Sequence, residues 1–332
     1  MDAAVIPGLA LREGVPAEFR TLVVVPTLLT SRDVIEELID KLEVHYLSNA
    51  DGELYFCLLT DWTDAATETT PMDAMLLTEA LAGISRLNLR HETDRFLLLH
   101  RGRKWNAQQN RWMGWERKRG KLQELNRLLR GASDTSFIAF GGKLPQSIRF
   151  VITLDADTKL PRDAARRLVG KLAHPLNQPK FDIEAGRVTE GFGVLQPRVT
   201  PTLPVGHYGS YFQRVYSSSR GIDPYVFAVS DVYQDLFGEG SFAGKGIYDI
   251  DAFETALARK IPENTMLSHD LFEGIFARAA LVTDVEVVEE FPERYGVAAA
   301  RQHRWTRGDL QLLPWMLGRR SARIPALGLW KV

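Results

Sequence analysis

The feature that most constrains this fold is the regular alternation of short apolar runs with longer segments of helical period. Residues 22–25 and 54–59 are apolar runs of the length typical of buried strands, and apolar residues recur at helical spacing over 34–42. This alternation predicts an α/β fold with an open, mostly parallel sheet flanked by helices. Ligands of such sheets bind beyond the carboxyl ends of the strands, so polar residues at those ends are the first candidates for a site.

The same patterns predict the elements along the chain. Pro26 is expected to end the first strand, and residues 30–33 are expected to cap the helix that follows. Further strands are predicted at 96–99, 147–154 and 281–288, and further helices at 72–89, 118–129, 250–257, 271–280 and 297–317. Frequent Gly, Pro and Tyr predict substrate-facing loops over 186–242.

One extended domain is favoured over two. Its predicted parts are a lead-in (1–19), the domain (20–318) with a nucleotide-binding half (20–157) and an acceptor-binding half (158–318), and a tail (319–332).

The composition excludes several classes of protein. The 332 residues are 45% apolar and 25% charged, and 41 Lys and Arg against 42 Asp and Glu give a net charge of −1. This balance argues against a broad nucleic-acid surface, although Trp105, Trp112 and Trp115 lie among cations. Those tryptophans are predicted to be core residues or the wall of a sugar groove. A single cysteine, Cys57, excludes an internal disulfide or a Cys-based zinc site and favours a reducing compartment.

No apolar stretch has the length of a membrane span, and the first residues lack the pattern of a signal peptide. The apolar and basic segment from residue 312 onwards suits either a packed helix or a bilayer surface, and the packed helix is favoured.

Two acidic residues, Asp155 and Asp157, follow the strand predicted at 147–154. In extended backbone, residues two apart face the same side, so both carboxylates could bind one hard cation or a ribose-diphosphate. The alternative is that Asp157 caps a helix entered at Pro161 and Asp155 is a solvated strand end.

Asp61 and the pair Pro26-Thr27 occupy equivalent positions after two other strands, where they could bind a nucleobase and ribose or only form turns. The basic segment 117–121 opens a helix, which invites an anion such as a diphosphate; a solvated basic turn is the alternative.

Three further segments hold candidate residues. Residues 238–246 lack the spacing of a P-loop and are predicted to form a flexible loop, including Phe242 and Gly244, that lets a sugar approach the backbone; an ordinary turn is the alternative. Asp270 is a candidate general base or a helix cap. Arg304 and Trp305 suit a departing diphosphate and the apolar face of a sugar ring, or else belong to a basic amphipathic helix.

These motifs, in this order, resemble the processive inverting glycosyltransferases of the GT-A fold, the class of cellulose and hyaluronan synthases. More narrowly, residues 240–249, 267–276 and 300–309 are similar to the glycosyltransferase domain of bacterial cyclic β-1,2-glucan synthases. The resemblance covers residues 20–315. It implies transfer of glucose from UDP-glucose to O2 of a growing β-1,2-glucan, with inversion at the anomeric carbon.

The resemblance also implies a role for each matching residue. The residues that would hold the donor are Pro26, Thr27, Asp61, Lys121, Asp155, Asp157 and Arg304, with Mg²⁺ or Mn²⁺ on Asp155 and Asp157. Asp270 would be the general base, and Trp305, Phe242 and Gly244 would contact the acceptor. Arg301 stands where the wider class has Gln, and Ser268-His269 replace its Thr-Glu.

The full-length relatives imply a location on the cytoplasmic face of the inner membrane, beside membrane spans and glycan-processing domains that this chain lacks. The chain itself is expected to be a soluble fragment that does not bind nucleic acid. Two alternatives stay open: a β-glycan synthase with another donor or linkage, and a catalytically silent module that binds a sugar nucleotide.

Overall fold

The computed structural model describes residues 5–202, 209–216, 232–266, 270–318 and 324–329. The chain forms two compact units, Leu11–Ala156 and Met1–Ala10 together with Asp157–Val332. We call the first the inner unit, because its sequence lies between the two segments of the second, the outer unit.

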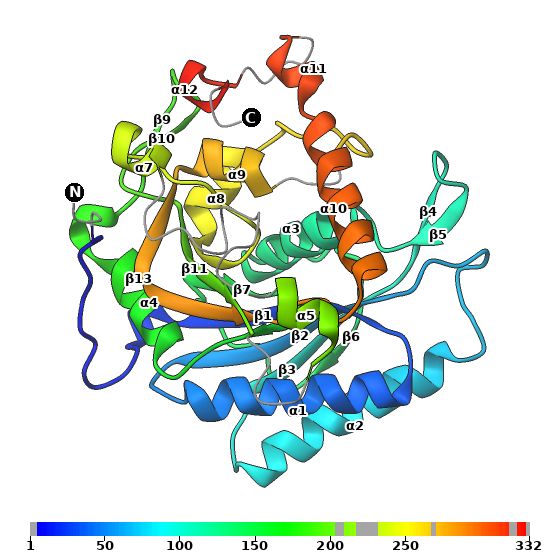
Figure 1. The fold of residues 1–332 in the computed structure, drawn as a ribbon. Coiled ribbons are helices and arrows are strands. Elements are labelled where there is room, and N and C mark those ends of the chain that lie inside the picture. The colour runs from blue at the N-terminus through cyan, green and yellow to red at the C-terminus, as the bar shows by residue number, and fades with distance from the viewer. Residues whose placement is uncertain (1–4, 203–208, 217–231, 267–269, 319–323, 330–332) are drawn as a thin grey trace. The chain divides into compact units, whose positions relative to one another are not determined.

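The inner unit contains a sheet of order β6-β3-β2-β1-β7. Neighbouring strands pair in parallel except β3 with β6. Helices α1 and α2 lie side by side on one face of this sheet and α3 lies on the other (Figure 1). Its elements are η1 (Ala17–Phe19), β1 (Thr21–Leu29), α1 (Arg32–Ser48), β2 (Leu54–Trp62), α2 (Asp73–Arg90), β3 (Phe96–Arg101), β4 (Lys104–Asn106), β5 (Arg111–Met113), α3 (Arg117–Leu129), β6 (Phe137–Gly141) and β7 (Phe150–Thr153).

The predicted strands and helices of this unit are all present, and the predicted cap is confirmed because the Ser31 side chain accepts a hydrogen bond from the Val34 amide (3.3 Å). Strands β1, β2 and β3 each run two to four residues beyond their apolar runs, because backbone pairing with the neighbouring strand continues there. The strand predicted at 147–154 is shorter and begins at Phe150. The edge strand β6 and the β4–β5 hairpin were not predicted.

The prediction that Pro26 ends the first strand is wrong. Val24 accepts a hydrogen bond from the Leu154 amide, so its backbone polar groups face β7, and by alternation those of Pro26 point the same way. Pairing with β7 stops at Val24, whereas pairing with β2 continues to Leu29. The missing N–H of Pro26 therefore costs no ladder hydrogen bond, and the strand passes through it.

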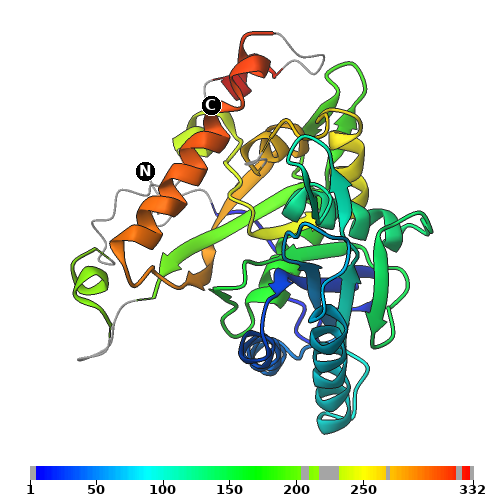
Figure 2. The same cartoon turned by 90° about the vertical axis from the view of Figure 1, so that its right-hand side faces the viewer.

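The outer unit contains strands in the order β12-β11-β13-β8, of which β11 and β13 are parallel. Its elements are β8 (Thr158–Lys159), α4 (Ala164–Ala173), η2 (Pro175–Asn177), β9 (Lys180–Asp182), β10 (Arg187–Glu190), β11 (Val194–Pro201), α5 (Tyr211–Tyr216), α7 (Val232–Phe237), β12 (Gly246–Asp249), α8 (Ile250–Leu257), α9 (Asp270–Ala277), β13 (Ala279–Glu289), α10 (Tyr295–Leu310), α11 (Leu313–Met316) and α12 (Ala326–Leu329). Figure 2 shows α10 as the long orange helix that follows β13. The predicted α/β class is thus confirmed in each unit separately.

Three predictions for this unit are corrected. Region 186–242 is not only loops, since it supplies β10 and the long strand β11. The helix predicted at 271–280 ends at Ala277, because Arg278 has a left-handed backbone (φ 55°) that starts β13. The helix predicted at 297–317 divides into α10 and α11. In the segment from residue 312 onwards Leu312 and Trp315 are buried, whereas Leu313 and Leu317 are exposed, so packing as one helix stays a prediction.

Residues near the amino terminus pack on α4 of the outer unit. The Leu9 amide donates to the Gly170 carbonyl (2.9 Å), and the Lys171 ammonium donates to the Ile6 carbonyl (2.5 Å). A Cβ at Gly170 would lie 2.2 Å from the Leu9 carbonyl oxygen, so only glycine permits this close approach. The first described residues thus complete the outer unit.

In the described part of the chain, no helix combines the length and apolar character that crossing a membrane requires.

Candidate functional site

The carboxyl end of β2 carries a buried acidic side chain, Asp61. Asp61 lies opposite Arg101 in the register of β2 and β3, so the two side chains are cross-strand neighbours. The guanidinium binds the carboxylate through two bonds, from Nε to Oδ1 (2.7 Å) and from Nη2 to Oδ2 (2.9 Å), and the Arg101 side chain is fully buried. Burial alone would raise the pKa of Asp61, but the cations of Lys121 and Arg101 outweigh it and hold the pKa below its usual value.

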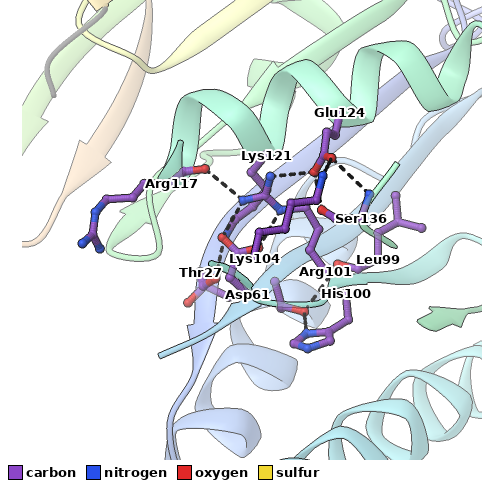
Figure 3. Close-up of polar contacts among 11 residues, drawn as sticks. Thr27, Asp61, Leu99, His100, Arg101, Lys104, Arg117, Lys121, Glu124 and Ser136 are labelled. Atoms are coloured by element: carbon purple, nitrogen blue, oxygen red, sulfur yellow. Dashed lines mark hydrogen bonds and ion pairs between the residues drawn. The ribbon is translucent and has the colours of Figure 1, made fainter. Parts of the chain in front are cut away.

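Two residues of α3 complete this cluster, which we call the inner charge cluster (Asp61, Arg101, Lys121 and Glu124). Arg101 Nη1 lies 2.8 Å from Glu124 Oε2, and Lys121 Nζ lies 2.7 Å from the Thr27 carbonyl oxygen and 3.2 Å from Asp61 Oδ2 (Figure 3). Burial lowers the pKa of Lys121 to about 8. Two anions and two cations therefore neutralise one another, and three residues predicted to hold the donor, Thr27, Asp61 and Lys121, lie in contact.

Sequence reasoning missed Arg101 and Glu124. Arg101 could have been found by the rule that identified Asp61, because each is a charged residue two positions after an apolar strand run. Glu124 lies among the leucines of a helix and gives no such signal. Gly114 also belongs to the site, since a Cβ there would lie 2.5 Å from Asp61 Oδ2.

The basic start of α3 is paired with carboxylates rather than merely solvated. Lys118 Nζ lies 2.5 Å from Asp155 Oδ1, and Arg117 Nη2 lies 2.8 Å from Asp64 Oδ2. The Arg117 side chain is 49% exposed and that of Lys118 28%, so both are ion-paired and in part solvated. Binding of a diphosphate there stays a prediction.

Asp155 and Asp157 follow β7, but not as a continuation of the strand. β7 ends at Thr153, and Ala156 and Asp157 form a turn before β8. Asp155 belongs to the inner unit and Asp157 to the outer unit. The capping alternative for Asp157 is wrong, because α4 begins at Ala164 and its N-cap is Asp163.

The donor chemistry of these two residues suits a hard cation. Both carboxylates are part-exposed, and Mg²⁺ typically binds one or two carboxylates together with substrate phosphates and water. Among the described residues, no three His, Cys, Asp or Glu side chains are grouped closely enough to form a metal site without such a substrate. Metal binding by Asp155 and Asp157 stays a prediction.

Asp270 is the first residue of α9, and its carboxylate packs directly against Gly244. A Cβ on Gly244 would lie 2.7–2.8 Å from the three carboxyl atoms, and the φ of Gly244 is +76°. Two sequence candidates that are 26 positions apart are thereby brought together. Ser268 and His269 lie outside the described residues. Phe242 is buried and packs on Gly274, so its ring is enclosed in this structure.

Helix α10 carries Arg304 and Trp305. Arg304 is exposed, whereas Trp305 is half-buried with the Arg301 guanidinium 4.8 Å from its ring centroid. Arg301 also forms an ion pair with Glu289 and lies 3.8 Å from Asp157 Oδ2. Arg301 thus contacts Asp157, a predicted metal ligand.

The tryptophans of segment 101–121 are predicted to be core residues or the wall of a sugar groove, and for Trp105 the core alternative is wrong. Trp105 and Trp112 face each other on the β4–β5 hairpin with ring centroids 6.0 Å apart, and Trp105 is 49% exposed. Trp115 lies beside the cations of Lys104 and Arg119.

The fold and these residues define a class of protein: the chain is an α/β protein whose acidic and basic side chains gather at the carboxyl ends of parallel strands. No protein-family profile matches the chain. Over 328 residues it is 54% identical to the cyclic beta-(1,2)-glucan synthase NdvB of Rhizobium meliloti (strain 1021), a match that covers 98% of this chain and 12% of that protein. The resemblance to cyclic glucan synthases indicated by the motifs is confirmed, and the chain spans about one eighth of the curated relative.

Solved structures give weaker similarities. The crystal structure of S. aureus TarS 1-349 aligns with a TM-score of 0.40 and 13% identity, covering 82% of this chain and 60% of that chain. The structure of S. aureus TarS aligns with a TM-score of 0.40 and 12% identity, covering 92% of this chain and 40% of that chain.

Proposed function

We propose that this chain is an inverting glucosyltransferase domain of the GT-A fold that transfers glucose from UDP-glucose to O2 of a growing β-1,2-glucan. The observation that carries the proposal is the 54% identity with a cyclic β-(1,2)-glucan synthase along nearly the whole chain.

In this proposal the inner charge cluster binds the donor. Asp61 and the Pro26-Thr27 segment contact the uridine, and Lys121 helps to hold the UDP-glucose donor. The cluster supports this role because Lys121 connects the ends of β1 and β2 through the Thr27 carbonyl and the Asp61 carboxylate. A carboxylate held ionised by two cations accepts hydrogen bonds only, so it suits a base that presents an N–H donor.

Asp270 is the proposed general base. It takes the proton of the acceptor hydroxyl while that oxygen attacks the anomeric carbon of glucose, and the bond from that carbon to the diphosphate oxygen breaks. Attack opposite the leaving group converts an α-linked donor into a β-linked product. The contact with Gly244 supports this role, because a residue without a side chain leaves the carboxylate next to backbone that a sugar can approach.

Asp155 and Asp157 would hold Mg²⁺ or Mn²⁺ on the diphosphate, where the ion would stabilise the charge that develops on UDP. The exposed Arg304 guanidinium is a further proposed partner of the diphosphate, and Trp305 a partner of the acceptor sugar. Phe242 and Gly244 are proposed to border the acceptor.

The remaining 88% of the relative's length has no counterpart in this chain. We propose that membrane spans and glycan-processing domains belong to that remainder, and that this domain works at the cytoplasmic face of the inner membrane. Ring closure is not expected of the chain alone.

The test is UDP release from UDP-glucose, with and without Mn²⁺ or Mg²⁺ and a β-1,2-linked gluco-oligosaccharide. Asp270→Asn should lower the rate by about 10²–10⁴-fold, the range for a positioned base. Asp251→Asn is the matched control, since Asp251 is also an acidic residue in the first turn of a helix, and should leave the rate unchanged. Binding of UDP without turnover would favour a silent sugar-nucleotide module, and turnover with another donor would favour a different β-glycan synthase.

A further inference from the structure

A second buried charge cluster lies in the outer unit around Glu289, a residue without any signal in the sequence. Glu289 is the last residue of β13 and is 7% exposed. Its Oε2 lies 3.1 Å from Lys245 Nζ, and its Oε1 forms an ion pair with the Arg301 guanidinium. One carboxylate therefore connects the glycine-rich segment before β12 with helix α10.

The Lys245 side of this connection leads to Asp270. Lys245 is buried and follows Gly244, the residue that packs against the Asp270 carboxylate. On its other side, Gly246 is so close to β11 that a Cβ would lie 2.1 Å from the Leu195 carbonyl oxygen. The segment therefore packs closely on both sides of Lys245, against the Asp270 carboxylate and the Leu195 carbonyl, and the ion pair with Glu289 fixes the residue between them.

The Arg301 side leads to Asp157 and Trp305. The Arg301 guanidinium lies 3.8 Å from Asp157 Oδ2 and 4.8 Å from the Trp305 ring centroid. The backbone of Asp157 is itself fixed to the end of β13, because the Glu290 amide donates to the Asp157 carbonyl (3.1 Å). Glu289 and Asp157 thus stand beside each other, and Arg301 contacts both carboxylates.

We infer that Glu289 is a positioning residue for glycosyl transfer. Through Lys245 it sets the glycine segment against Asp270, and through Arg301 it sets α10, with Arg304 and Trp305, beside the Asp157 turn. This inference rests on the proposed function. Arg301 replaces the Gln of the wider class, and the ion pair explains that replacement: a cation at position 301 can bind the buried Glu289, and an uncharged amide binds a buried carboxylate less strongly.

Glu289→Gln keeps the shape of the side chain and removes its charge. Lys245 and Arg301 then lose their shared counter-ion, and Arg301 is left with Asp157. We expect kcat for acceptor-dependent UDP release to fall at least tenfold, because the base and the diphosphate-binding helix both shift, while KM for UDP-glucose stays within about threefold, because the nucleoside contacts lie on other residues.

Glu286→Gln is the matched control. Glu286 lies three residues earlier on β13 and forms an ion pair with Arg198, and among the described residues it has no ion pair with a proposed site residue. Its kcat should equal that of the unmodified chain. Arg301→Gln should lower kcat in the same way, and the double variant should be no slower than the slower single variant, because both act through one connection. A folded Glu289→Gln chain with unchanged kcat, or effects of the two substitutions that multiply, would overturn the inference.

Two measurements keep the test decisive. If Glu289→Gln does not fold, the Arg301→Lys and Arg301→Gln variants are compared. Arg301→Lys should keep at least a third of the UDP-release rate of the unmodified chain, and Arg301→Gln should not. Equal rates in the two variants would overturn the inference. If the unmodified chain releases no UDP, the proposed function fails for the isolated chain. The role of Glu289 is then tested by the fluorescence of Trp305, which is obtained by subtracting the spectrum of the Trp305→Phe variant. That emission should change in Glu289→Gln and not in Glu286→Gln, whereas an unchanged emission in both would refute the positioning.

Discussion

Replacing Arg101 by Met is the sharpest test of the inner charge cluster. Its guanidinium is fully buried and serves two carboxylates, Asp61 and Glu124, whose side chains are 4% and 2% exposed. Removing one partner of a buried ion pair costs about 3–5 kcal/mol, because a buried charge is left uncompensated. Arg101→Met affects two such charges, but Lys121 still contacts Asp61 and Ser136 still donates to Glu124. We therefore expect a loss of about 4 kcal/mol in the free energy of unfolding.

The assay is urea unfolding followed by circular dichroism, with the stability change taken from the shift in midpoint at an unchanged slope. Arg90→Met is the matched control, because Arg90 binds Glu43 at 3.0 Å but is 62% exposed, and exposed pairs contribute about 0–1 kcal/mol. Adding Glu124→Gln to Arg101→Met should recover part of the loss, since it removes one of the two stranded charges. A loss no larger than that of Arg90→Met, or no recovery in the double variant, would refute the interpretation of the cluster as a set of mutually dependent buried charges.

Two further predictions concern Gly244 and His45. Gly244→Ala should lower the rate of UDP release at least tenfold, because the new Cβ would lie within 2.8 Å of the Asp270 carboxylate. Gly131→Ala is the control and should leave the rate unchanged, because Gly131 also has a positive φ but has open space around it. Rates that fall equally in both variants would point to backbone strain instead. Burial lowers the pKa of His45 to about 4 from an ordinary 6.5, so the unfolded chain takes up the proton first as the pH falls. The contribution of His45 to the free energy of unfolding should be fully present above pH 6.5 and be lost as the pH falls towards 4. The loss should be about 3 kcal/mol, at about 1.36 kcal/mol per pKa unit. Urea midpoints measured across that pH range should decline less in His45→Leu than in the unmodified chain.

The positions of the main elements follow from the sequence because each has a local cause. The apolar runs of β1, β2 and β3 and the Ser31 cap of α1 depend on neighbouring residues alone, so local patterns suffice to place them. Pro26 was misread because its effect depends on where the neighbouring strand β7 stops. Strand β11 was missed because Gln196 and Pro197 interrupt its apolar pattern. Gln196 is buried but accepts from the Ala243 amide (2.8 Å), a contact that the local sequence does not reveal.

The candidate site divides in the same way. Asp61, Asp155 and Asp157 could be selected because they follow strands, and Asp270 because it precedes a helix. Their partners could not, with the exception of Arg101. Glu124 is paired only because α3 packs over the ends of β2 and β3, and Glu289 is paired only because the segment before β12 and helix α10 both approach the end of β13. Local sequence identifies groups that end an element, whereas partners that meet through packing require the structure.

The packing of residues 5–10 on α4 has a consequence for how the chain is made. A ribosome releases the whole of the inner unit, Leu11–Ala156, before it releases Gly170 and Lys171, the residues on which Ile6 and Leu9 dock. Residues 5–10 therefore have no docking site until the inner unit and α4 have been synthesised, and the outer unit includes a segment made before its partners. Removing residues 5–10 would for this reason take away part of the outer unit, although those residues precede the whole inner unit in the sequence.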